Sequence, residues 1–136
     1  MKLRYHGFSL VELMIVVAIL SIVTAWGYGS YRDTVIKSHR SEGLGELLMI
    51  ADKLERYYAD HGTYAGAQLG NTENTVHASS SKNGYYNFSI TTASAIQFTI
   101  TATPQGGQAD DSLCGTFTLD SLGTRTASGS HADKCW

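Results

Sequence analysis

Residues 7–28 read GFSLVELMIVVAILSIVTAWGY, an almost unbroken apolar segment in which Glu12 is the one charged side chain. A helix needs about 20 apolar residues to cross the hydrocarbon core of a bilayer, so this segment is long enough to span one. Residues 1–7, MKLRYHG, are polar and basic, which favours a cytoplasmic N-terminus. The apolar segment is longer than the core of a secretory signal, and no small-residue cleavage site follows it. We therefore predict one N-terminal membrane helix.

The helical pattern continues beyond the apolar segment. Apolar side chains recur at steps of three or four residues, at Leu44, Leu47, Leu48, Ala51, Leu54 and Tyr58. This spacing predicts an apolar stripe along one face of a helix. Asp52 and Arg56, four residues apart, support the polar face, and Gly62 is a suitable C-terminal stop. A helix from about Phe8 to Asp60 would be roughly 80 Å long at 1.5 Å per residue.

The rest of the sequence predicts a small sheet. Residues 62–84 are rich in Gly, Asn, Ser and Thr, which indicates a connecting loop. Apolar and polar residues then alternate in three runs: Tyr86, Phe88 and Ile90; Ile96, Phe98 and Ile100; Phe117 and Leu119. A turn at residues 120–123 leads into a fourth run at 124–126. We expect an α+β fold, in which the long N-terminal helix packs on an antiparallel sheet of about four strands.

Composition and motifs argue against several classes of function. The chain of 136 residues leaves room for one compact domain beyond an anchor, and its net charge of −2 argues against a nucleic-acid partner. Beyond the helix, the basic side chains are Lys82, Arg125 and Lys134. The absence of a nucleophile-elbow motif gives no reason to expect an enzyme.

Metal and cofactor sites are not expected either. The five histidines share no ligand spacing and are predicted to lie scattered on the surface: His6, His39, His61, His77 and His131. Asp110 and Asp111 in a Gly-rich loop allow either a calcium site or a solvated turn. We favour the turn, because the wider set of oxygen ligands that calcium requires is not evident.

The sequence Gly7-Phe8-Ser9-Leu10-Val11-Glu12 at the head of an apolar helix resembles the processing motif of type IV prepilins. In that family a peptidase cuts between the glycine and the phenylalanine and then methylates the new N-terminal amine. The resemblance therefore implies cleavage between Gly7 and Phe8. It also implies three segments: a leader (1–7), a transmembrane and assembly helix (8–29) and a globular head domain (30–136).

Both this resemblance and physical chemistry indicate that the carboxylate of Glu12 needs a partner. A carboxylate within an apolar helix costs several kcal/mol unless it is paired. In the family, its partner is the positively charged N-terminus of a neighbouring subunit, so the resemblance implies a role for Glu12 in subunit assembly. The alternative is a glutamate that reaches the lipid headgroups near the start of the helix.

The C-terminal region resembles the disulfide-bounded loop of PilE-type minor pilins. The resemblance rests on Cys114-Gly115-Thr116-Phe117-Thr118-Leu119-Asp120 and on Asp133-Lys134-Cys135-Trp136, and it implies a Cys114–Cys135 disulfide. A bond between these two cysteines is also the expected state outside the cytoplasm, although two unrelated buried thiols are the alternative. Family members often carry a helix-kinking proline where this chain has Gly29. Gly27 and Gly29 lower helix propensity by about 1 kcal/mol each and could soften the helix there.

The resemblance implies a structural subunit of a type IV pilus, of the minor pilin class, involved in pilus assembly, twitching motility and surface attachment. The implied partners are the prepilin peptidase, other pilin subunits and the pilus assembly machinery. The precursor would cross the inner membrane once, with its head in the periplasm, and the processed subunit would enter an extracellular fibre. The alternatives are a type II secretion pseudopilin, a DNA-uptake (competence) pilin, and a membrane-anchored binding domain that never polymerises.

Overall fold

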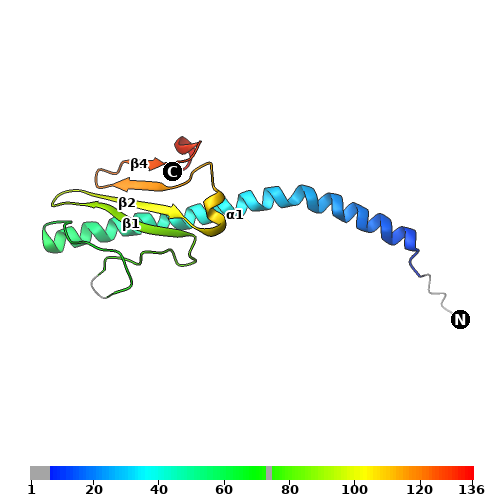
Figure 1. The fold of residues 1–136 in the computed structure, drawn as a ribbon, viewed down its shortest axis with the longest axis horizontal. Helices are drawn as coiled ribbons and strands as arrows, with labels where there is room; N and C mark the ends of the chain where they lie inside the picture. Colours follow the sequence, from blue (N-terminus) through cyan, green and yellow to red (C-terminus); the bar gives the residue numbers. More distant parts are fainter. Residues whose placement is uncertain (1–6, 73–74) are drawn as a thin grey trace. The chain divides into compact units, whose positions relative to one another are not determined.

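The structure is a computed structural model that describes residues 7–72 and 75–136 (Figure 1). The chain divides into two compact units, one ending at Val35 and the other running from Ile36 to Trp136. The predicted leader falls almost entirely outside the described residues, together with the basic side chains that favoured a cytoplasmic N-terminus. The predicted boundaries at residues 7/8 and 29/30 stay predictions.

One long helix, α1 (Leu10–His61), contributes to both units. It begins two residues later than predicted and remains helical through Gly27 and Gly29. The end of the helix at His61 confirms the prediction that Gly62 terminates it. Gly62 adopts a positive φ of 70°, and its N–H donates to the carbonyl of Tyr58 at 2.7 Å. Glycine reaches this left-handed conformation without steric cost, which is why it so often follows the last turn of a helix.

The second unit contains a four-stranded antiparallel sheet in the order β1-β2-β3-β4, as expected from the sequence (Figure 1). The strands are β1 (Tyr86–Ala93), β2 (Phe98–Pro104), β3 (Phe117–Asp120) and β4 (Arg125–Ala127). Two short 3₁₀ helices lie in the connections: η1 (Gly106–Asp110) and η2 (Ala132–Lys134). The sheet is a simple meander, in which each strand pairs with the next one along the chain.

The prediction that the second strand includes Ile96 is wrong. Ile96 lies in the β1–β2 turn, where its side chain is 72% exposed. The strand starts later because Ser94 closes the turn: its N–H donates to the carbonyl of Gln97, and its hydroxyl accepts the N–H of Gln97. A side chain that hydrogen-bonds locally competes with strand pairing, so alternation of apolar residues alone placed the boundary too early.

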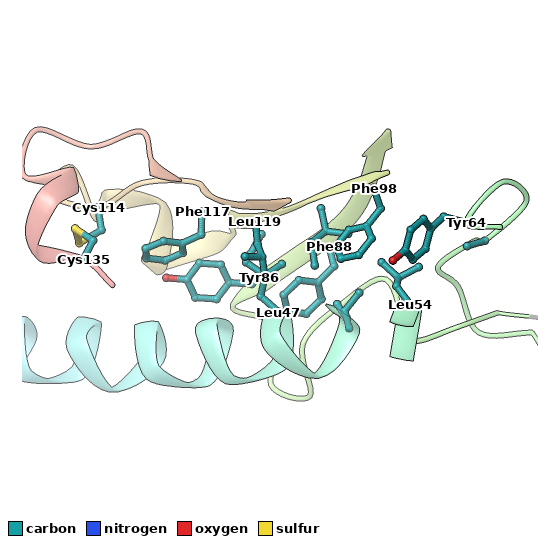
Figure 2. Packing of buried hydrophobic residues seen from close by; sticks show 14 residues of the cluster. Leu47, Leu54, Tyr64, Tyr86, Phe88, Phe98, Cys114, Phe117, Leu119 and Cys135 are labelled. Carbon is teal, nitrogen blue, oxygen red and sulfur yellow. A yellow bond between two sulfur atoms is a disulfide. The ribbon is translucent and has the colours of Figure 1, made fainter. Parts of the chain in front are cut away.

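The core of the second unit lies between α1 and one face of the sheet (Figure 2). Its fully buried side chains include Leu47, Ile50 and Leu54 from the helix, facing Tyr86, Ile100 and Phe117 from the strands. The predicted stripe is therefore largely correct, but Leu48 is 43% exposed and Ile50 takes the central place instead.

Gly43 allows the helix to approach the sheet closely, and replacing it with Ala should destabilise the head. A Cβ atom at this position would lie 2.6 Å from Cδ2 of the buried Tyr86 ring. Overpacking of this kind costs roughly 1–3 kcal/mol. Gly45 is the matched control, because it lies two residues along the same helix and has no atom within 4 Å of the corresponding Cβ position. Chemical denaturation should show a loss for Gly43→Ala and a gain of up to about 1 kcal/mol for Gly45→Ala; equal effects would contradict the close approach.

Tyr86 should make the stability of the head depend on pH in alkaline solution. Burial raises the pKa of Tyr86 to about 12, although a hydrogen bond from Gln108 partly opposes the shift. Above pH 10 the unfolded phenol loses its proton while the folded phenol keeps it, so the free energy of unfolding should fall as the pH rises from 10 to 12. The loss amounts to about 2–3 kcal/mol. Denaturation curves across this range should show a weaker pH dependence for Tyr86→Phe; an unchanged slope would refute the assignment.

Candidate functional site

The predicted processing site lies immediately before α1. Gly7, Phe8 and Ser9 are not helical, and the first bond of the helix runs from the N–H of Leu13 to the carbonyl of Ser9. Phe8 is 79% exposed, and no atom lies within 4 Å of the Cβ position at Gly7. The Gly7–Phe8 peptide bond is thus both accessible and free of helical hydrogen bonding, as a peptidase requires of its substrate.

The first turns of α1 present an apolar surface to the outside. The large apolar side chains from Phe8 to Trp26 are between 47% and 87% exposed. Within the described part of the chain, α1 is the one helix that is long and apolar enough to cross a membrane. Exposed apolar surface of this extent marks a region that lies in lipid or against other proteins.

Glu12 differs from the other polar side chains in this apolar stretch. The hydroxyl of Ser21 donates to the carbonyl of Val17 at 2.7 Å, and that of Thr24 donates to the carbonyl of Leu20 at 2.8 Å. These hydroxyls are satisfied within their own helix. Glu12 forms no hydrogen bond or ion pair with residues 7–72 or 75–136, and its position in the first turn of α1 gives it only the modest stabilisation of the helix dipole. Its carboxylate is therefore available to a group outside the described chain.

The second predicted feature, the disulfide, is confirmed. Cys114 and Cys135 are bonded, with their Cα atoms 5.6 Å apart, at one end of the buried cluster (Figure 2). Backbone bonds hold the enclosed loop closed from within: Gly129 N–H donates to the carbonyl of Cys114, and His131 N–H to that of Leu113.

A buried polar layer, which sequence reasoning missed, ties this loop to α1. Asp111 is 3% exposed, and its carboxylate accepts from Nη2 of Arg40 at 2.6 Å and from the backbone N–H of Cys114 at 3.2 Å. The solvated turn predicted for this residue is therefore wrong, because the carboxylate is paired across the fold. The only sequence signal was two adjacent aspartates in a Gly-rich loop, which says nothing about a partner 71 residues away.

Gln108 extends the polar layer. Its side chain is 1% exposed; Nε2 donates to the hydroxyl of Tyr86 at 3.0 Å and to the carbonyl of Ile36 at 3.2 Å. Nδ1 of His39 lies 3.1 Å from Gln108 Oε1, and the His39 ring stacks on Tyr85. A buried amide with both of its ends satisfied fixes η1 against the helix.

The histidines that the structure describes lie apart from one another and mostly contact aromatic rings. His61 stacks on Tyr57, and His77 lies edge-on to Phe88. Across residues 7–72 and 75–136, no group of three or more His, Cys, Asp or Glu side chains is placed to hold a metal ion. His6 lies outside the described residues.

Comparisons with known proteins place these features in a family. A family model described as "Prokaryotic N-terminal methylation motif" matches residues 2–28. A second, described as "Type IV minor pilin ComP, DNA uptake sequence receptor", matches residues 29–118.

Individual relatives agree with the family models. The chain is 38% identical over 78 residues to the type IV major fimbrial protein FimA of Dichelobacter nodosus, covering 54% of this chain and 48% of FimA. It is 36% identical over 88 residues to a fimbrial protein of Neisseria meningitidis, covering 63% and 49% of the two chains. The matched region thus spans about half the length of these curated relatives.

A solved structure agrees over a larger share of the fold. A type IV pilin from Shewanella oneidensis is 33% identical to this chain, with a TM-score of 0.53, over 74% of this chain and 97% of that pilin. The processing motif, the long helix and the sheet with its disulfide therefore have one common explanation. This chain belongs to the type IV pilin family.

Proposed function

We propose that this chain is a subunit of a type IV pilus that is anchored in the inner membrane as a precursor and joins an extracellular fibre after processing. The observation that carries the proposal is the exposed apolar surface of α1 with one carboxylate, Glu12, that has no partner in the described chain. The prepilin peptidase would cut after Gly7 and methylate the amine of Phe8. The pilus assembly machinery and other pilin subunits would be the further partners.

The physical reason for assembly lies in Glu12 rather than in the apolar surface. Lipid tails are about as apolar as Leu side chains, so moving an apolar helix from a bilayer into a bundle of helices gains little by itself. A carboxylate in hydrocarbon is costly in both places unless a cation meets it. The amine of a neighbouring Phe8, released by cleavage, supplies that cation and sets the axial position of one subunit against the next.

The minor pilin class is supported by the family model over residues 29–118, whose description names a minor pilin. Twitching motility and surface attachment are the roles that we propose with it. The relatives named as major fimbrial proteins match over about half of their own length. Comparing the amount of this chain with that of the most abundant fibre subunit would test the minor class.

The intact mass of the chain recovered from sheared fibres tests the main proposal. We expect a chain that begins at a methylated Phe8 and is two hydrogens lighter because of the disulfide. A full-length chain found only in the membrane would instead favour an anchored domain that never polymerises.

DNA binding is the second candidate function, favoured by the description of the family model as a DNA uptake sequence receptor. The net charge of −2 opposes it, because DNA-binding faces are normally basic. Mobility-shift titrations at several salt concentrations would decide. A receptor should show affinity that falls steeply with salt and that depends on the DNA sequence; no shift at low salt would exclude the function.

A further inference from the structure

A basic cavity of about 300 Å³ lies beside the disulfide in the second unit. The Cys114–Cys135 bridge and Leu113 form its apolar part. Every other side chain that lines it is basic: Lys37, Arg40, His131 and Lys134. Asp133 follows in the chain next to Lys134, but it is exposed and does not line the cavity.

Two of these basic groups remain available to a ligand. Arg40 is bound to the buried carboxylate of Asp111, so its guanidinium mainly forms one fixed side of the cavity. Lys37 and Lys134 are exposed and form no ion pair with any residue that the structure describes. Positive charges around a concavity raise the local concentration of anions, even on a protein whose net charge is negative. The cavity is therefore suited to a single compact anion.

The place of Lys37 on α1 indicates where such an anion would come from. Trp26 and Tyr31 are 87% and 70% exposed, and aromatic residues of this kind mark the interface at the end of a membrane helix. Lys37 follows Tyr31 by six residues, which is about 9 Å along a helix. The headgroup layer is roughly 5–8 Å thick on each side of a bilayer, and helical side chains lean toward the N-terminus of their helix. With residues 8–29 anchored as we propose, this spacing brings the Lys37 ammonium back to the depth of the lipid phosphates.

We propose that this cavity binds the phosphate of an anionic phospholipid headgroup while the precursor is anchored in the membrane. This proposal rests on the proposed anchoring of residues 8–29, because that anchoring sets the distance between the cavity and the lipid phosphates. A nucleic acid fits less well, because its backbone needs a row of cations. Arg125 does not extend the cavity into such a row, since it lies over the Trp136 ring, with its Cζ 5.5 Å from the ring centroid. The bound headgroup holds the head close to the bilayer until the subunit leaves for the fibre.

The test uses the full-length chain in nanodiscs of phosphatidylcholine that contain a minor fraction of phosphatidylglycerol. Native mass spectrometry of the released protein measures which lipid stays bound. We expect enrichment of phosphatidylglycerol over its bulk fraction, falling about fivefold with Lys37→Gln and again with Lys134→Gln. Lys82→Gln, a change of the same type at an exposed lysine outside the cavity, should leave the enrichment unchanged.

The possible outcomes separate this site from the anchoring on which it depends. Failure of the chain to insert into these nanodiscs would overturn both the anchoring and the lipid site. Insertion without enrichment, or enrichment that Lys37→Gln and Lys134→Gln do not change, would overturn the lipid site alone. Inorganic phosphate or a short DNA duplex that shifts the amide signals of residues 131–135, when phosphatidylglycerol does not, would assign the cavity to a different anion and likewise overturn the proposal.

Discussion

Replacing Glu12 with Ala should lower the amount of this chain in sheared fibres by at least about tenfold, while cleavage after Gly7 continues. The reason is that the carboxylate forms no bond with the described part of its own chain, and in the assembly that we propose it pairs with the amine of a neighbouring Phe8. Losing a charge pair in an apolar surrounding costs well over the 1.4 kcal/mol that corresponds to tenfold. Quantitative immunoblotting of fibre and membrane fractions measures both the incorporation and the processing.

Two further variants identify the property of Glu12 that matters. Glu12→Gln keeps the length and hydrogen-bonding capacity of the side chain but removes its charge, so it should fail nearly as strongly as Ala. Thr24→Val removes a hydroxyl that bonds within its own helix, and it should assemble normally. Wild-type incorporation of Glu12→Ala would refute the pairing, whereas normal incorporation of Glu12→Gln alone would assign the effect to hydrogen bonding instead of charge.

Local signals predicted the elements of this fold well. The three- and four-residue spacing found the helical stripe, and Gly62 ended the helix because the residue after the last turn takes a positive φ. The alternation of Tyr86 and Phe88 found β1 for a similar reason, since each face of a strand repeats every two residues. These patterns succeed because they reflect short-range geometry that tertiary contacts only reinforce.

The sequence patterns did not predict contacts between segments that are far apart along the chain. Nothing in the sequence paired Arg40 with Asp111, and nothing marked Gln108 as buried, because both depend on how η1 meets the helix. The basic cavity was missed for the same reason. Of the three Lys and Arg side chains beyond the helix only Lys134 lines the cavity, whereas Lys37 and Arg40 on α1 are two of its four basic side chains.

Removing both cysteines, by Cys114→Ala with Cys135→Ala, should lower the free energy of unfolding of the head by about 3 kcal/mol. The bridge joins residues 21 apart, and opening a loop of that length returns about this much conformational freedom to the unfolded chain. The double change leaves no free thiol to react. Chemical denaturation of the variant and the wild type under identical conditions measures the difference, and alkylation of the unfolded, non-reduced wild type should label no thiol.

The variant should still fold, because the bridge is not the only restraint on this loop. Asp111 accepts the N–H of Cys114 while it binds Arg40, and Gly129 donates to the carbonyl of Cys114. Without the bridge, these bonds hold the Cys114 end of the loop, whereas the segment from His131 to Trp136 loses its covalent restraint. Hydrogen exchange should therefore accelerate most in residues 130–136 and least in β1 and β2. Uniform acceleration across the sheet would show that the disulfide supports the whole head, and an unchanged free energy of unfolding would show that the polar layer alone suffices.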